Sequence, residues 1–205
     1  MLHLDYTDCL LKINSKTARC NKQGEFDMAN TSNEEAKRFS KECIFTALMS
    51  LMEQKPFEKI SITEIAQKAG VSRNAVYRNF NTKEDILKDS ISGITSGFIE
   101  SLKTRSFASY DDYTLAVFRH LDETKDIGLA MVKADMTWIL FDSFMMFRGR
   151  FEVDDRIKSY YENYRIGAIF YLYITWLENG CRETPEELVQ IFRQIGKVSG
   201  TVPNF

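Results

Sequence analysis

The chain has 205 residues, of which 44% are hydrophobic and 27% charged, and its formal net charge at pH 7 is −2. This length allows one or two domains with a sizeable core, and the near balance of charges excludes a protein that coats nucleic acid through uniform positive charge. A local basic face remains enough for DNA binding. With three prolines and ten glycines the chain has few helix breakers, and it lacks alternating strand patterns, so we expect an all-α fold.

Residue types that bind metals or act in catalysis are sparse. The four cysteines are widely separated, without a C-x-x-C pair, and the two histidines are His3 and His120. We therefore expect no metal site, no cofactor and no enzymatic activity. The most apolar stretch, residues 166–177, is too short to span a bilayer, and no secretory signal pattern is present. These features favour a cytoplasmic protein without membrane contact.

The first 27 residues lack a sustained hydrophobic period, and their charges cancel. A segment more typical of a natural N-terminus begins at Met28. We interpret residues 1–31 as an N-terminal extension, disordered or appended. The alternative is an arm that reaches DNA, and the absence of a basic cluster argues against it.

The first predicted helix runs from about Asn33 to Glu53. Its apolar residues recur with the i, i+3, i+4 rhythm of an amphipathic helix. Ser32 and Glu35 form a capping-box pattern at its start, in which each side chain satisfies a backbone N–H of the other residue. Pro56 ends the segment, because proline cannot continue a helix.

Residues 61–83 have the pattern of two short helices joined by a tight turn. Ser61 and Glu64 form a second capping-box pattern, and Gly70 suits the left-handed backbone that ends many helices. Ser72 is a favourable N-cap for the next helix, residues 73–80. This arrangement predicts a helix-turn-helix, whose second helix enters the DNA major groove.

The second of these helices carries side chains that suit DNA. Arginine can bond guanine edges and asparagine adenine edges, while hydroxyl groups suit phosphate. The predicted base-edge contacts are Ser72, Arg73, Asn74 and Arg78. The predicted phosphate contacts are Thr63, Tyr77, Asn79 and Lys83, the last at the start of a further helix whose N–H groups would also face phosphate.

This stretch resembles the DNA-binding domain of the TetR/AcrR family of transcriptional regulators. The matching residues are Ser61, Ile65, Ala66, Ala69, Gly70, Val71, Ser72, Tyr77, Phe80, Lys83, Glu84, Ile86 and Leu87. Two positions depart from the family pattern: Ser61 stands where Thr is commoner, and Asn79 where His or Tyr is frequent. The Asn79 departure puts one phosphate contact in doubt.

The resemblance implies a helix-turn-helix DNA-binding domain over residues 32–97 and a helical ligand-binding and dimerisation domain over residues 98–205. It also implies a homodimeric regulator, usually a repressor, that binds double-stranded operator DNA and is released by an unidentified small-molecule effector. The alternatives are a co-regulator on the same scaffold that acts through protein partners, and a helix-turn-helix that serves only packing.

A helix predicted from Lys83 to about Leu102 contains Gly93 and Gly97, which weaken an exposed helix. In the family it resembles, this helix connects the two domains. The glycines fit either a pendulum motion of that helix or close packing against a neighbour.

The second half of the chain predicts helices near residues 110–124, 126–149, 154–180 and 185–197, the second of which can break. Methionine and aromatic residues fit an adaptable apolar pocket as well as an ordinary core. The residues selected for the pocket are Trp138, Phe141, Asp142, Met145, Tyr164 and Tyr171. Asp135 and Asp142, seven apart and so expected on one helix face, are either solvated or paired with a cationic ligand; solvation is favoured.

The helix over residues 154–180 is apolar nearly all round between residues 166 and 177. Such a helix must be buried on every side, which implies a second subunit. Gly167 and Ala168 would permit close approach. Thr184 and Pro185 begin the last helix, whose predicted buried stripe is Leu188, Ile191, Phe192 and Ile195. We expect a homodimer through residues 154–180 and 185–197, since this ending is similar to the C-terminal regions of TetR-like proteins.

Overall fold

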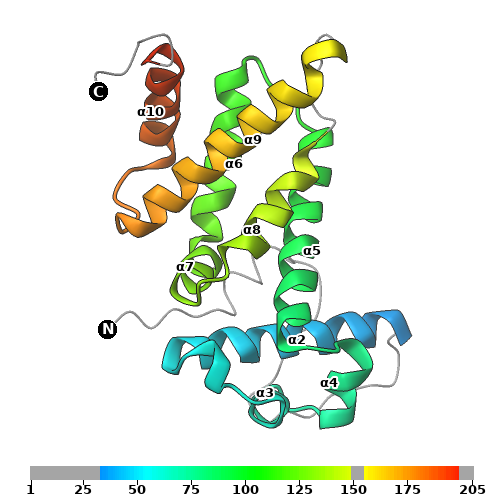
Figure 1. The fold of residues 1–205 in the computed structure, drawn as a ribbon. Helices are drawn as coiled ribbons and strands as arrows, with labels where there is room; N and C mark the ends of the chain where they lie inside the picture. The colour runs from blue at the N-terminus through cyan, green and yellow to red at the C-terminus, as the bar shows by residue number, and fades with distance from the viewer. Residues whose placement is uncertain (1–32, 149–154, 199–205) are drawn as a thin grey trace. The chain divides into compact units, whose positions relative to one another are not determined.

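The computed structural model describes residues 33–148 and 155–198, and all regular structure in these ranges is helical (Figure 1). The all-α prediction is therefore confirmed. The chain divides into two compact units, the first ending at Ser90 and the second beginning at Ile91. The domain boundary predicted after residue 97 falls further along the same helix. No helix in the described ranges is long and apolar enough to cross a membrane.

The first unit contains α2 (Asn33–Gln54), the 3-10 helix η1 (Phe57–Lys59), α3 (Ile62–Lys68), α4 (Arg73–Asn79) and the beginning of α5 (Lys83–Lys103). Helix α2 packs against α3 and α4 (Figure 1). The fully buried side chains of this small core are Ile44, Leu48, Met49, Ile65, Val76, Ile86 and Leu87. The predicted extent of α2 is correct to within one residue at its end, whereas its predicted cap, Ser32, lies outside the described residues.

Local hydrogen bonds define the two short helices as their sequence predicts. Ser61 Oγ accepts the Glu64 N–H at 3.3 Å, and Glu64 Oε2 accepts the Ser61 N–H at 3.0 Å. Gly70 has φ +67°, the left-handed conformation expected of it. Ser72 Oγ accepts the Ala75 N–H at 3.1 Å and caps α4. The capping box, the glycine turn and the second cap are thus confirmed.

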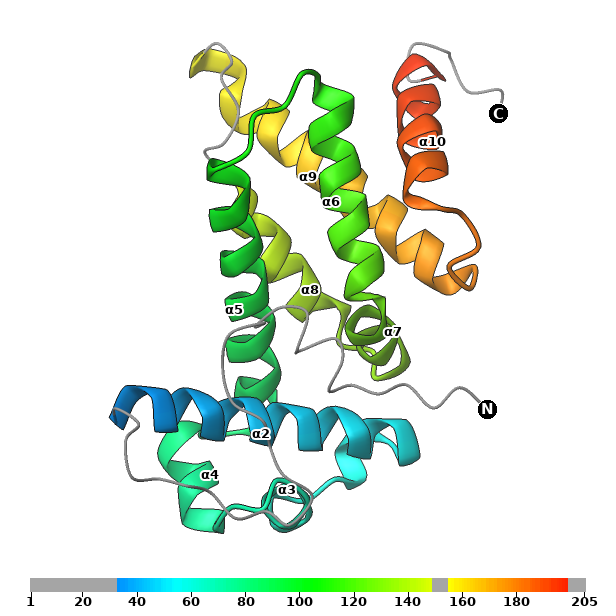
Figure 2. The ribbon, with the colours of Figure 1, turned by 180° about the vertical axis from the view of Figure 1, so that it is seen from behind.

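The second unit contains the remainder of α5, α6 (Tyr110–Glu123), α7 (Lys125–Lys133), α8 (Thr137–Phe144), η2 (Met145–Phe147), α9 (Asp155–Glu178) and α10 (Pro185–Val198). Helix α7 packs against α8 and α9. Helix α10 lies alongside α6, as Figure 2 shows. The element order agrees with the sequence prediction, including the possible break within residues 126–149.

That break occurs at Asp135, which has φ +56°, and the Met136 N–H donates to Met131 O at 2.9 Å. Asp135 therefore lies between α7 and α8 and not on a helix. The expectation that Asp135 and Asp142 share one helix face is wrong, because a helical period does not continue through a left-handed residue. Both side chains are exposed, in agreement with the favoured solvated interpretation.

The start of α10 has the predicted cap: Thr184 Oγ1 accepts the Glu187 N–H at 3.2 Å, and the carboxylate accepts the Thr184 N–H at 2.8 Å. Leu188 is buried against the unit, but Ile195 is 49% exposed. In the single chain, the predicted buried stripe of α10 is therefore wrong at its C-terminal residue, Ile195.

Three charged contacts hold α10 in the second unit. Arg119 of α6 donates to Glu186 at 2.7 Å, and Arg193 of α10 pairs with Asp111. The Arg165 guanidinium of α9 lies 4.8 Å from the ring centroid of Phe192 on α10 and 3.9 Å from that of Tyr110 on α6, in the geometry of cation–π contacts. These contacts join α6 and α9 to the last helix.

Gly128 lies where α7 closely approaches α9. A Cβ atom on this residue would overlap the Tyr173 hydroxyl and lie 2.8 Å from Leu177 Cδ1. Both of these side chains are buried, so neither can swing into solvent. Gly93 and Gly97 differ, because an added Cβ there would meet no atom of the described residues within 4 Å. Close packing therefore does not explain them, and the pendulum interpretation stays a prediction.

We expect Gly128→Ala to lower the free energy of unfolding of the second unit by about 1–3 kcal/mol, the usual cost of overpacking. Urea unfolding followed by tryptophan fluorescence measures this unit, because both tryptophans, Trp138 and Trp176, lie in it.

Gly97→Ala is the matched control. It removes the same glycine flexibility from an open helix position and should raise stability by up to about 1 kcal/mol. A Gly128→Ala protein as stable as the Gly97→Ala protein would show that α7 and α9 do not pack as described.

Candidate functional site

The exposed face of α4 brings together the side chains predicted to read DNA. Arg73, Asn74, Tyr77 and Arg78 are all exposed, at positions i, i+1, i+4 and i+5 of one helix. Val76 and Phe80, on the other side, are buried in the first unit. The helix therefore has one anchored apolar side and one polar side that faces away from the core.

The polar groups on this face are available to a ligand. Among the described residues, none forms a hydrogen bond or ion pair with the side chain of Arg73, Asn74 or Arg78. Their guanidinium and amide groups can make bidentate bonds to the edges of guanine and adenine. Thr63, on α3, is also exposed. These residues form a surface with the chemistry that a DNA groove requires.

Two of the predicted contacts have part of their hydrogen-bonding capacity in use. The Ser72 hydroxyl accepts a bond as the cap of α4 but can still donate one. Asn79 is half-buried, and its side-chain amide donates to Ala75 O at 2.8 Å within the same helix. Asn79 therefore offers one remaining N–H and one carbonyl oxygen to phosphate or water.

Lys83 has an unexpected position. Its ammonium group donates to the backbone oxygens of Phe57 and Ile60, each at 2.8 Å, and lies 4.4 Å from the Phe57 ring centroid. The same ammonium group donates a longer bond of 3.5 Å to the backbone oxygen of Glu58, so each of its three N–H donors has an acceptor within the domain. The structure thus gives Lys83 a positioning role, since it ties the start of α5 to the loop before α3.

The start of α3 is held by a charged pair. The Glu64 carboxylate accepts hydrogen bonds from the Lys55 ammonium and from Ser61. These bonds, with that from Lys55 the largest cause, lower the pKa of Glu64 to about 2. The capping carboxylate therefore stays ionised across the pH range in which the protein would work.

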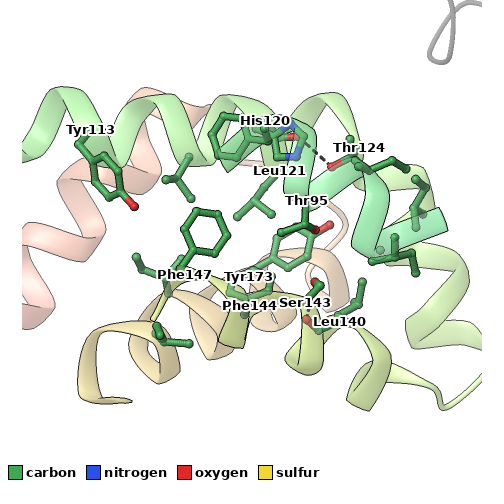
Figure 3. A pocket seen from close by; sticks show the side chains of 18 residues that line it. Thr95, Tyr113, His120, Leu121, Thr124, Leu140, Ser143, Phe144, Phe147 and Tyr173 are labelled. Carbon is green, nitrogen blue, oxygen red and sulfur yellow. Dashed lines mark hydrogen bonds between the residues drawn. The ribbon is translucent and has the colours of Figure 1, made fainter. Parts of the chain in front are cut away.

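The second unit contains a partly open cavity of about 60 Å³. Its walls come from α5 to α9 and η2, and Figure 3 shows side chains of α6 facing those of α8, η2 and α9 across it. Ile91, Ile94, Val117 and Ile169 are among its apolar lining residues. Two hydroxyl groups in the wall are occupied by backbone oxygens: Thr124 donates to His120 O at 2.8 Å and Ser143 to Leu140 O at 2.7 Å. The interior therefore favours apolar groups.

His120 is the titratable group with the most altered environment in this wall. Its ring is stacked on Phe98, with centroids 4.0 Å apart and 6° between the planes. Burial, and secondarily the positive charge of Arg105, lowers the pKa of His120 to about 4. The imidazole is therefore neutral at physiological pH.

None of the six residues predicted for the pocket lines this cavity. Trp138, Phe141, Tyr164 and Tyr171 are exposed, by 45%, 38%, 56% and 69%, Asp142 is also exposed, and Met145 is half-buried. Helix α8 presents Leu140, Ser143 and Phe144 to the cavity instead. Because α8 is apolar on both sides, periodicity could not show which side faces inward.

Sequence reasoning also missed Phe98 and His120 as cavity residues. From the sequence, His120 stands out only as a candidate metal ligand or catalytic base. The only sign in the sequence that His120 lines a cavity is its place within the amphipathic pattern of α6. Whether its ring faces inward depends on how α5 packs against α6. Among the described residues, no group of three or more His, Cys, Asp or Glu side chains could hold a metal ion.

The depressed pKa of His120 predicts acid lability of the second unit. Because the folded pKa, about 4, is below the ordinary value of 6.5, the unfolded chain binds more protons between these values. The free energy of unfolding of the second unit is therefore unaffected by His120 above pH 6.5, and it falls as the pH is lowered toward 4. In His120→Phe, which keeps a stacked ring but cannot titrate, this loss should be smaller.

The measurement is the urea midpoint of tryptophan fluorescence at pH 7, 6, 5 and 4.5. Carboxylates with lowered pKa values, such as Glu186 and Glu187, lose their contribution at lower pH and are common to both proteins. Parallel pH profiles for the two proteins would contradict a buried neutral His120.

Comparison with known families agrees with both units. A family model described as "Bacterial regulatory proteins, tetR family" matches residues 44–89, and one described as "Transcriptional regulator C-terminal region" matches residues 109–197. The first match contains the second half of α2, all of α3 and α4, and the beginning of α5, and the second extends from the start of α6 into α10.

Solved structures share the fold at low sequence identity. The "Dihydroxyacetone kinase operon activator DhaS" is 19% identical, with a TM-score of 0.54, over 78% of this chain and 95% of that one. A "tetR-family transcriptional regulator from Streptomyces coelicolor" is 17% identical, with a TM-score of 0.54, over 82% of this chain and 83% of that one. The "fatty acid degradation regulator FadR from Bacillus halodurans" is 17% identical, with a TM-score of 0.50, over 81% and 95%. With the helix-turn-helix and the two family matches in order along the chain, these findings show that the protein belongs to the TetR family of bacterial transcriptional regulators, which bind DNA.

Proposed function

We propose that α4 enters the major groove of an operator and reads its sequence. The observation that carries this proposal is the polar face of α4, where Arg73, Asn74 and Arg78 are exposed and have no partner among the described residues. Ser72 would complete the set of base-edge contacts. Thr63, Tyr77 and Asn79 would contact phosphates and fix the position of the helix.

Lys83 would contribute less to phosphate binding than its sequence position suggests. Two of its three N–H groups form short bonds within the domain and the third a long bond of 3.5 Å to the Glu58 backbone oxygen, so a phosphate would have to replace that third bond. Its main contribution would then be to hold the loop that precedes α3. The salt dependence of DNA binding should consequently change little when Lys83 is lost.

We propose that the functional form is a homodimer through α9 and α10. Exposed apolar side chains follow α9 with spacings of three, four and seven residues: Ile157, Tyr160, Tyr164 and Tyr171. This spacing forms one stripe along the helix, of the kind that packs against another helix. A second copy would bury the stripe and place two α4 helices on the half-sites of a near-palindromic operator.

The proposed output is repression that is relieved when an effector binds in the second unit. A co-regulator that acts mainly through protein partners is the other candidate. Its distinguishing property would be the absence of sequence-specific DNA binding. One fold relative is named an operon activator, so the sign of regulation requires its own measurement.

Arg78→Ala should weaken binding to the protein's operator by about 1–3 kcal/mol and relax discrimination at one base position. The physical reason is the loss of a bidentate contact to a base edge. Gel-shift titration with the upstream region of the protein's own operon, against a scrambled duplex, measures both quantities.

Arg182→Ala is the matched control, because it removes the same exposed charge from the second unit. Lys83→Ala offers a contrast: it should lower the stability of the first unit more than it alters the salt dependence. Equal affinity of the wild-type protein for operator and scrambled DNA would favour the co-regulator.

Tyr171→Glu should shift the protein toward the monomer, because a buried unpaired carboxylate at the interface is costly. Sedimentation equilibrium over a range of concentrations measures the shift. Tyr77→Glu makes the same change at an exposed tyrosine of the first unit and should leave the dimer intact. If both variants dimerise as the wild type does, the stripe on α9 is not the interface.

A further inference from the structure

A second hollow, of about 330 Å³, adjoins the apolar cavity of the second unit. Phe98 and His120 line both, so this stacked ring pair is the wall common to the two spaces. The hollow differs from the cavity in its chemistry. Its charged lining residues are Arg105, Asp112, Arg119 and Glu123.

Most of this charge is already engaged. Arg119 donates to Glu186 at 2.7 Å, and Asp112 accepts a bond from Ser109 Oγ at 2.8 Å at the start of α6. The Arg105 side chain, in contrast, has no hydrogen-bonding or ion-pair partner among the described residues. The hollow therefore presents a cation that can receive an anionic group.

The wall between the two spaces suits the passage of an apolar chain. Phe98 and the imidazole of His120 are flat, stacked and uncharged at neutral pH. Behind them the cavity is lined by aliphatic and aromatic side chains, and two of its hydroxyl groups are bonded to backbone oxygens. A chain without polar groups would thus lose no hydrogen bonds on entering.

We propose that the second unit binds an anionic amphiphile with a carboxylate head and an unbranched apolar tail. The head would lie in the hollow beside Arg105, and the tail would pass Phe98 and His120 into the cavity. This inference rests on the proposed effector role of the second unit and names the chemical class of that effector.

The cavity volume gives the proposal a mechanical consequence. About 60 Å³ is less than half of the roughly 150 Å³ that accommodates benzene in an engineered protein cavity. A tail longer than a few carbons must therefore move α5 and α6 apart at the ring pair. Helix α5 also contributes Ile86 and Leu87 to the core of the first unit, so the helix displaced by the tail takes part in both units.

The test is direct binding to the full chain without DNA, by isothermal titration calorimetry. The probes are hexanoate, octanoate and decanoate, each below its micelle concentration, with octan-1-ol and octyltrimethylammonium as head-group controls. Burial of the tail should raise affinity by about fourfold for each methylene. Octanoate should bind more tightly than octan-1-ol, and octyltrimethylammonium most weakly.

Arg105→Gln should lower octanoate affinity by about tenfold, the effect of losing one charged hydrogen bond, and leave octan-1-ol unchanged. Lys103→Gln is the matched control, since Lys103 is exposed near the end of the same helix and lines neither space. Ile94→Phe, which fills part of the cavity, should weaken both probes. Circular dichroism checks that each variant is folded.

Equal octanoate affinity in Arg105→Gln and Lys103→Gln would overturn the head-group site. Affinity that does not rise from hexanoate to decanoate would overturn the tail site without requiring any variant. Because no DNA is present, these outcomes are independent of operator binding. A chain that binds decanoate but no operator would contradict the proposed DNA-binding function and leave this inference standing.

Discussion

The proposed DNA-reading surface depends on a helix that is too short to be stable alone. Helix α4 has seven residues, whereas isolated helices shorter than about 12–15 residues are marginal in water. Its shape is imposed by the cap from Ser72 and by the burial of Val76 and Phe80. The exposed Arg73 and Arg78 can be oriented only because these other groups are held, so the proposed DNA recognition would depend on the core of the first unit.

Charged side chains in both units act over short distances and on specific partners. Lys83 reaches from α5 to the backbone oxygens of Phe57 and Ile60. An apolar side chain at this position would leave those two oxygens without this hydrogen-bond donor. Glu64 completes a cap and a pair with Lys55. Arg105 lacks such a partner among the described residues, and for this reason the proposed anionic head group is placed beside it. The small net charge of the chain conceals these local arrangements.

The pocket illustrates where sequence reasoning reaches its limit. Phe141 and Tyr171 were attractive candidates because aromatic residues line many ligand sites, yet both are exposed in one chain. The left-handed Asp135 changes the phase between α7 and α8, so a periodicity carried across it assigns the wrong face. Phe98 and His120 lie far apart along the chain, and only the packing of α5 and α6 stacks them.

Sequence alone determined the helix-turn-helix, its caps, the order of the helices and the family, because capping boxes, glycine turns and amphipathic periods act within a few neighbouring residues. Ser61 with Glu64 and Thr184 with Glu187 are examples in which three residues of spacing suffice. Tertiary structure decided which face of α8 meets the cavity and what Lys83 binds. It also decided that His120 is half-buried and stacked on Phe98. Those properties depend on groups brought together from distant segments, whose mutual positions no local pattern encodes.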